Sequence, residues 1–212
     1  MPPPINTCMP PEFVADAMLL TLFPGTTLAR SQQGSLAAPG KSVNGKETPQ
    51  FVADAMLKKL ARWLRIFGAK TDFIPSTMRD SQILKMMREK KNRSKILLTQ
   101  DVQLHERAKL KGFQSFLVPR EVPVEEQVAA VLKEFSLSLD DFPANTLCPS
   151  CNGELRIAKK SEVKGKVHEN VYKAHRKFWL CGKCGKAYWE GTHWERIGEA
   201  AKRVNRLLRE KE

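Results

Sequence analysis

Apolar residues from position 49 onward alternate between two patterns. Short runs rich in Val, Ile, Leu and Phe are typical of buried strands, and we expect strands at residues 51–53, 71–74, 95–99 and 116–118. Between these runs, apolar residues recur as on one face of a helix, and we expect helices at residues 55–67, 81–91, 102–111 and 124–135. Strands that alternate with helices predict right-handed crossovers and a mostly parallel sheet with helices on both faces.

The first of these helices has two chemically distinct faces. Lys58, Arg62 and Arg65 are spaced by four and then three residues, so we expect them to form a basic stripe. Gly68 marks the end of the helix, because glycine readily adopts the backbone conformation that follows a helix C-terminus. The apolar positions, which we expect to face the core, are Met56, Leu57, Leu60, Trp63, Leu64 and Phe67.

The first 48 residues differ in composition from the rest of the chain. They are rich in Pro, Gly, Ser and Thr, and residues 30–48 have almost no apolar periodicity, which predicts disorder. Residues 11–19 read PEFVADAML and residues 49–57 read PQFVADAML, so eight of nine positions repeat. The repeat is too short for a solenoid unit and indicates a local duplication or a gene-model error. Only the second copy runs into an amphipathic helix, so we treat that copy as functional.

Three aspartates follow or open the predicted elements. Asp54 directly follows the first strand, Asp101 comes shortly after the third, and Asp80 opens the intervening helix. Ligands of open parallel sheets bind beyond the carboxyl ends of the strands. Three carboxylates there would repel one another unless a cation joined them, and Mg²⁺ or Mn²⁺ prefers such oxygen ligands. A cation so placed would activate water and stabilise charge on a phosphodiester under attack.

The same aspartates have a simpler interpretation. Each precedes or opens a helix, where aspartate is a favoured N-cap residue. Capping is therefore the alternative to a metal site, and the two roles can coexist. Lys58, Lys59 and Arg62 lie in the helix after Asp54, where they would steer and hold a phosphate backbone.

Cysteine spacing predicts a second metal site. Four of the five cysteines form two C-x-x-C pairs separated by 29 residues, namely Cys148 with Cys151 and Cys181 with Cys184. Two such pairs let four thiolates surround one structural Zn²⁺, and the spacing accommodates a β-hairpin insert. The alternative is a redox pair, which needs only one of the two motifs. Cys8 is left over.

Charge points to a polyanionic partner. The net charge is +13, of which residues 1–48 contribute zero, residues 49–147 contribute +5 and residues 148–212 contribute +8. An excess confined to the part expected to fold favours nucleic acid, although a merely soluble basic protein remains the alternative. The chain has no apolar run long enough for a membrane span and no secretion signal at its start, so we expect an intracellular protein of the cytoplasm or nucleus.

The C-terminal third mixes basic and aromatic residues. Such mixtures suit single-stranded nucleic acid, but the aromatic residues are equally suited to the small core that a zinc ribbon needs. Residues 196–211 are spaced as a basic helix that either docks on the body or binds RNA. The residues concerned are Lys159, Lys160, Lys164, Lys166, Arg176, Lys177, Phe178, Trp179, Tyr188, Trp189 and Trp194.

Several of these motifs together resemble a known family. The stretch FVADAMLKKLARWLRIFG, Asp80 before a helix, ILLTQD and the downstream Arg107-Ala108 resemble the Mut-seven-C RNase domain family, as do CPSCNGEL and CGKCGKAYWEGTHW in the tail. The resemblance covers residues 50–197. It implies a PIN-like three-layer α/β/α fold with a small C-terminal zinc ribbon, and metal-dependent cleavage of RNA with Asp54, Asp80 and Asp101 as acidic ligands.

The chain departs from this family at three points. Lys58 stands where the family has glycine, and Gln100 stands where a basic residue is common, which removes a positive charge beside the expected metal. No fourth acidic ligand is obvious. Glu126 is the candidate for that role, and the alternative is that it stabilises the start of its own helix.

The sequence therefore predicts a division into an extension at 1–48, a PIN-like nuclease domain at 49–143, a zinc ribbon at 144–195 and a basic helix at 196–212. The expected function is divalent-metal-dependent, endonucleolytic cleavage of single-stranded RNA, with Lys58, Lys59, Arg62 and Arg107 binding substrate and the ribbon assisting. One alternative is a non-catalytic RNA-binding module of the same fold. Another is a scaffold protein without a nucleic-acid role.

Overall fold

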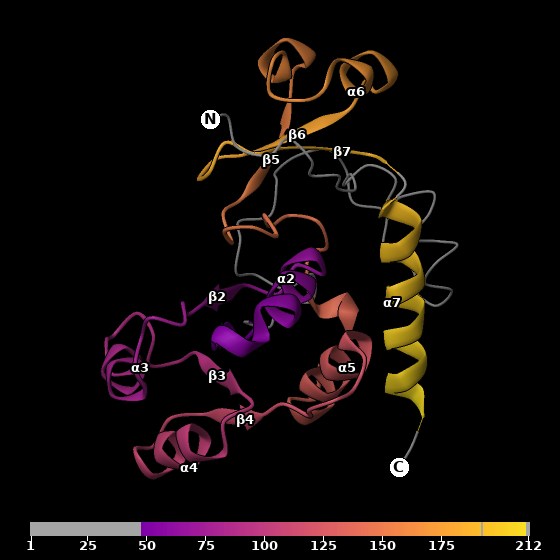
Figure 1. Cartoon of the computed structure of the whole chain (residues 1–212). Coiled ribbons are helices and arrows are strands. Elements are labelled where there is room, and N and C mark those ends of the chain that lie inside the picture. Colours follow the sequence, from indigo (N-terminus) through magenta and orange to yellow (C-terminus); the bar gives the residue numbers. More distant parts are fainter. Residues whose placement is uncertain (1–47, 192, 211–212) are drawn as a thin grey trace, which may run out of the picture.

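The predicted strands form one four-stranded sheet in the order β2-β1-β3-β4, and every pairing in it is parallel (Figure 1). This computed structural model describes residues 48–191 and 193–210. Val52 pairs with Asp72 on one side and with Leu97 on the other, which places β1 at the centre. The strands are β1 (Phe51–Ala53), β2 (Thr71–Phe73), β3 (Ile96–Thr99) and β4 (Ser115–Leu117).

Helices cover both faces of this sheet, as the sequence predicts. They are η2 (Ala55–Leu57), α2 (Lys58–Ile66), α3 (Asp80–Met87), α4 (Val102–Leu110) and α5 (Val124–Glu134). In Figure 1, α2 and α5 lie on one side of the strands, and α3 and α4 lie on the other. The α3 helix ends four residues before the predicted position 91, because the buried side chain of Asn92 donates to the carbonyl of Met86 at 3.1 Å.

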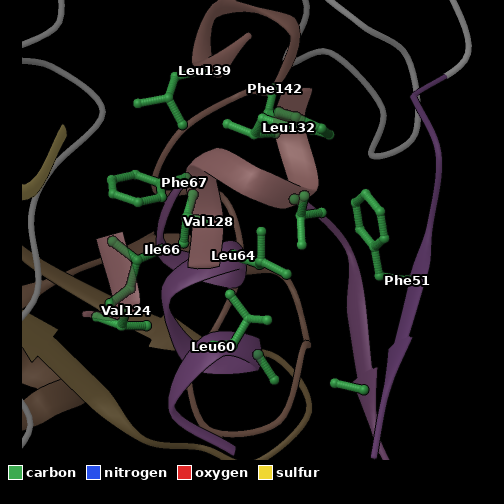
Figure 2. Close-up of a cluster of buried hydrophobic side chains, with 14 of the residues drawn as sticks. Phe51, Leu60, Leu64, Ile66, Phe67, Val124, Val128, Leu132, Leu139 and Phe142 are labelled. Atoms are coloured by element: carbon green, nitrogen blue, oxygen red, sulfur yellow. The ribbon is translucent and has the colours of Figure 1, made fainter. Parts of the chain in front are cut away.

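Successive side chains of the central strands pack into two separate cores, one on each face of the sheet. Phe51 and Ala53 pack with α2 and α5, whereas Val52 points to the opposite face with α3 and α4. Figure 2 shows the first of these cores, in which Phe51 lies beside side chains from α2 and α5. This alternation follows from the two-residue period of a strand. It gives a three-layer α/β/α arrangement.

Two expectations for the first helix are wrong. Met56 is 62% exposed, because residues Ala55–Leu57 form a 3₁₀ turn whose three-residue period shifts Met56 off the apolar face of α2. Arg65 is only 5% exposed and therefore does not belong to the basic stripe. Gly68 does end the helix, with a φ of +90°, and a Cβ there would lie 2.3 Å from the carbonyl oxygen of Pro143.

The C-terminal part forms a second sheet that is antiparallel, in the order β5-β6-β7. The connection between its first two strands carries a short 3₁₀ turn and a helix. The elements are β5 (Leu155–Ala158), η4 (Lys160–Val163), α6 (Glu169–Ala174), β6 (Phe178–Cys181) and β7 (Ala187–Trp189). Phe178, Trp179, Tyr188 and Trp189 are all buried. Of the two interpretations of these aromatic residues, the structure supports the ribbon core.

The last helix, α7 (His193–Arg209), packs against α5 (Figure 1). Arg203 of α7 pairs with Glu126 of α5 at 3.1 Å, and Ala200, Ala201 and Val204 are buried in the same core as α2 and α5. The predicted C-terminal helix therefore docks on the body. That core also contains side chains of the second sheet, so the two sheets share a continuous apolar interior.

The extension predicted at residues 1–48, the first copy of the repeat and Cys8 lie outside the described residues, apart from position 48. No helix within residues 48–191 and 193–210 combines the length and the apolar character needed to cross a membrane. The remaining short element is η3 (Leu139–Asp141), which follows α5.

Candidate functional site

Thr99 forms hydrogen bonds with both Asp54 and Asp101 at the carboxyl edge of the parallel sheet. The buried hydroxyl of Thr99 donates to Oδ2 of Asp54 and accepts the backbone N–H of Asp101 at 3.0 Å. Asp54 is itself only 6% exposed, and its N–H donates to the carbonyl of Leu98 in the neighbouring strand at 3.1 Å. One hydroxyl thus links the Asp54 carboxylate, at the end of β1, to the backbone of Asp101, just beyond the end of the adjacent strand β3.

Both of these aspartates also cap helices. Oδ1 of Asp54 accepts the N–H of Met56 at 2.8 Å, and Oδ1 of Asp101 accepts the N–H of Leu104 at 3.0 Å. The predicted capping role is therefore confirmed for this pair. An ionised carboxylate has about four lone-pair sites, so the caps leave capacity for further ligands.

Asp80 has a different partner. It is the first residue of α3, and its Oδ2 accepts Nη1 of Arg107 from α4 at 3.3 Å. Both side chains are partly exposed, so the pair contributes little to the free energy of unfolding. The structure therefore links Asp54 to the backbone of Asp101 through Thr99, and it pairs Asp80 with Arg107, a predicted substrate-binding residue.

Predicted basic residues lie on the α2 side of this edge. Lys58 and Lys59 are exposed in the first turn of α2, and Arg62 is exposed one turn further along. Glu126, the candidate fourth acid, is in the first turn of α5 and pairs with Arg203. That contact supports the interpretation of Glu126 as a residue that stabilises its own helix and its neighbour.

The four paired cysteines come together at the start of the second sheet. Their Sγ atoms all lie within 4.8 Å of one another. Among the residues that the structure describes, they are the one group of three or more Cys, His, Asp or Glu side chains close enough to hold a metal ion. The three aspartates do not gather as closely. Four thiolates in one cluster are the ligand set of a structural zinc site.

The two C-x-x-C turns have the same backbone design. In the first turn, the N–H of Asn152 donates to the carbonyl of Cys148 at 2.9 Å, and in the second the N–H of Gly185 donates to the carbonyl of Cys181 at 3.0 Å. Asn152 and Gly185 have φ values of +62° and +69°. A Cβ at Gly153 would lie 2.9 Å from Sγ of Cys181, so only glycine leaves room for the sulfurs. This repeated cradle fits one tetrahedral ion.

Two of the four sulfurs, those of Cys148 and Cys181, have polar contacts within the ribbon. The Tyr188 hydroxyl lies 2.8 Å from Sγ of Cys148, and the N–H groups of Lys183 and Cys184 each donate to Sγ of Cys181 at 3.4 Å. Burial raises the pKa of the Cys148 thiol. Burial also acts on Cys181, but donors from its own turn outweigh it and lower the pKa of that thiol. Four thiolates at these distances would repel one another without a cation, so the close cluster suits a metal site, and these cysteines could hold a zinc ion.

The first cysteine turn is fastened to the edge strand β2. Oδ1 of Asn152 accepts the N–H of Thr71 at 3.1 Å, and Nδ2 donates to Oδ1 of Asp72 at 3.1 Å. Buried Arg65 donates through Nε to the carbonyl of Thr71 at 2.7 Å and through Nη1 to the carbonyl of Pro149 at 3.1 Å. Asn152 thus serves both the turn, through its backbone, and the sheet, through its side chain.

Asn152→Gly should separate these two roles. Glycine adopts the left-handed backbone without strain, as Gly185 does in the matching turn, so zinc content should not change. The lost contacts to β2 should lower the free energy of unfolding by about 1–2 kcal/mol. Metal analysis and urea unfolding measure the two effects. A loss of zinc without any loss of stability would contradict this assignment.

Comparison with known families agrees with this arrangement. The family model described as the Mut7-C RNAse domain matches residues 49–201, which is more than half of the chain. The chain belongs to this family. Searches of curated proteins and of solved structures gave no significant match. The match covers both sheets and about half of α7, so the Mut7-C region includes the cysteine cluster.

Membership of the Mut7-C RNAse domain family indicates a nuclease-type function with RNA as substrate. It confirms the resemblance seen in the sequence. The sequence pattern does not predict the roles of Thr99 and Asn152, and it predicts an exposed position for Arg65, which is buried. Only Thr99 carried a local signal, because it is a hydroxyl residue at the end of a strand and two positions before an aspartate.

Proposed function

We propose that this Mut7-C domain is a divalent-metal-dependent ribonuclease that cuts single-stranded RNA endonucleolytically. Residues 49–143 supply the catalytic site, and the ribbon at 144–195 assists RNA binding. The observation that supports the proposal is the Thr99 hydroxyl bond to Asp54, which joins two strand ends that each carry a carboxylate.

Asp54 and Asp101 are the first ligands in the proposed site, with Asp80 as the third. Mg²⁺ or Mn²⁺ bound there would lower the pKa of a bound water and stabilise charge on the phosphodiester. Asp80 becomes available when Arg107 turns from its carboxylate to an RNA phosphate. This exchange suits Arg107, because its side chain is about half exposed and guanidinium binds phosphate in two-pronged geometry.

The positions of Lys58 and Lys59 support a substrate-binding role. Both are in the first turn of α2, where the helix dipole disfavours positive charge, and no acidic residue offsets them in that turn. Stability of the helix therefore does not explain these lysines. A phosphate backbone that approaches the Asp54 end of α2 does explain them, and Arg62 extends the same positive surface.

Exposed apolar side chains near the aspartates favour a single-stranded RNA substrate over a duplex. Met56 is 62% exposed and lies two residues after Asp54, and Val102 is 54% exposed and directly follows Asp101. Large apolar groups beside a charged site suit contact with splayed bases, which only single strands offer. Duplex RNA would present phosphates and sugars to this edge instead.

The ribbon assists by charge rather than by stacking. Its main aromatic residues are buried, so they are not free to stack on bases. Its exposed cations are Arg156, Lys159, Lys164, Lys166, Lys173, Arg176, Lys177, Lys183 and Lys186. Such a surface attracts a phosphate backbone without reading its sequence.

Digestion of labelled RNA tests the proposal. Purified protein with Mn²⁺ should convert an unstructured RNA with blocked ends into internal fragments, and it should leave the same RNA annealed to its complement largely intact. Circular single-stranded RNA, which has no ends, provides the matched control for endonucleolytic action. Salt-sensitive binding without any product would instead support the non-catalytic RNA-binding alternative.

A further inference from the structure

Arg120 lies at the same edge of the sheet as the proposed catalytic carboxylates. It follows the end of β4, which is the strand next to β3 in the sheet. Its Nε donates to the carbonyl of Gln100 at 3.0 Å, and its Nη2 donates to the same oxygen. Gln100 directly precedes Asp101, so the Arg120 guanidinium is held one peptide away from a proposed metal ligand.

The loop that carries Arg120 is tied to the sheet edge from both sides. The side-chain amide of Gln100 donates to the carbonyl of Pro119 at 2.9 Å, and the amide of Gln127 from α5 donates to the same carbonyl at 3.1 Å. The next residue, Glu121, has a φ of +56°, a conformation that residues other than glycine rarely adopt. The guanidinium is therefore held in one orientation although its side chain is exposed.

This orientation leaves donors for a ligand. Guanidinium has five N–H donors, and the Gln100 carbonyl occupies only two of them. The carbonyl is neutral, so it does not cancel the positive charge. Arg107, by contrast, already pairs with Asp80. At this edge Arg120 is a preorganised cation with unused donors, and that is what recognition of a phosphate requires.

We infer that Arg120 binds a backbone phosphate of the RNA next to the one that is cleaved. The inference rests on the proposed function, because it places the substrate across the edge that carries Asp54 and Asp101. Without cations beside them, those carboxylates would repel the approaching backbone. Lys58 and Lys59 bind the RNA on the α2 side of the carboxylates, and Arg120 binds it on the β4 side.

The alternative is that Arg120 only ties two loops together. Binding of a labelled single-stranded RNA, measured over a range of salt with no added Mg²⁺ or Mn²⁺, separates the two roles. The variants are Arg120→Gln, which removes the charge, and Arg120→Lys, which keeps it. Arg93→Gln is the matched control, because Arg93 is exposed but precedes β3 at the opposite edge of the sheet.

Arg120→Gln should lower the salt slope of the RNA affinity by about 0.7, the value for one phosphate contact on a single strand, and weaken binding about fivefold at 0.1 M salt. In cleavage assays KM should rise by a similar factor while kcat changes little, because a contact to a flanking phosphate is made before and during reaction alike. Arg120→Lys should restore the salt slope, and Arg93→Gln should leave it unchanged.

Two results would overturn the inference. One is an unchanged salt slope and affinity for Arg120→Gln in a protein whose wild type still cuts RNA, which would leave the proposed function intact. The other is a lower thermal midpoint with unchanged RNA affinity, which would assign Arg120 to loop tying alone. A reduced slope in a protein that cuts nothing would support the phosphate contact and reject the catalytic proposal.

Discussion

Asp54→Asn is expected to lower the rate of RNA cleavage by at least about 100-fold, because it removes a negative ligand of the proposed metal site. The substitution should keep the fold, although it removes the carboxylate oxygen that accepts the Thr99 hydroxyl and should therefore lower the free energy of unfolding by about 1 kcal/mol. Asparagine caps helices about as well as aspartate does, so the bond to the N–H of Met56 is retained. Single-turnover cleavage with Mn²⁺ measures the rate, and the thermal midpoint measures the stability.

Asp72→Asn is the matched control for this prediction. Asp72 is on the neighbouring strand β2, but its carboxylate accepts hydrogen bonds from Nζ of Lys95 at 2.6 Å and from Nδ2 of Asn152 at 3.1 Å. Burial raises the pKa of Asp72, but these donors and the charge of Arg65 outweigh it, so the pKa lies below its usual value. Loss of that charge should therefore reduce stability and leave the cleavage rate of the folded protein unchanged.

The pair of variants separates a catalytic from a structural aspartate. If Asp54→Asn cuts RNA at the wild-type rate, then Asp54 is a helix cap and nothing more. If both variants lose rate only in proportion to the unfolded fraction, the site at the sheet edge is not catalytic. The proposed function requires opposite patterns, with rate lost at Asp54 and stability lost at Asp72.

The order of strands and helices could be predicted because the signals are local. Strand β3 is a continuous apolar run, and α2 repeats apolar residues at helical spacing, so neither depends on distant residues. Parallel pairing then follows from the alternation of strand and helix. These local signals are enough to predict that Asp54 and Asp101 lie at the same edge of the sheet.

Arg65 shows what local patterns do not reveal. By spacing it belongs with Lys58 and Arg62, but its hydrogen-bond partner Pro149 is 84 positions away in the chain. A buried guanidinium is stable only when such partners satisfy its donors. No residue near Arg65 in the sequence indicates that partner, so the burial of Arg65 could not be inferred.

The candidate metal sites differ in the same way. The cysteine cluster could be predicted from spacing alone, because a structural zinc ion takes four ligands and each C-x-x-C turn provides two of them. The acidic site depends on side-chain orientation, which sequence does not set. Asp80 is an example, since its pairing with Arg107 depends on how α3 and α4 lie beside each other.

Removal of the zinc expected in the cysteine cluster should destabilise the whole folded region rather than the ribbon alone. Cys148 and Tyr188 are buried in the same core as Leu64 and Val128 of the first sheet's helices. For a structural zinc site, the free energy of metal binding is free energy of folding. A loss of about 4 kcal/mol would lower the thermal midpoint of a chain this size by about 10 °C.

Cys148→Ser tests this expectation without a chelator, which would also remove the catalytic metal. Zinc content should fall from about one ion per chain to nearly none, and tryptophan fluorescence and circular dichroism should report one lowered transition for both sheets. Cys8→Ser is the matched control, because Cys8 stands outside the two C-x-x-C pairs and should keep the zinc and the midpoint. Two separate transitions, with the parallel sheet melting as in the wild type, would show that the ribbon folds independently and would contradict a shared core.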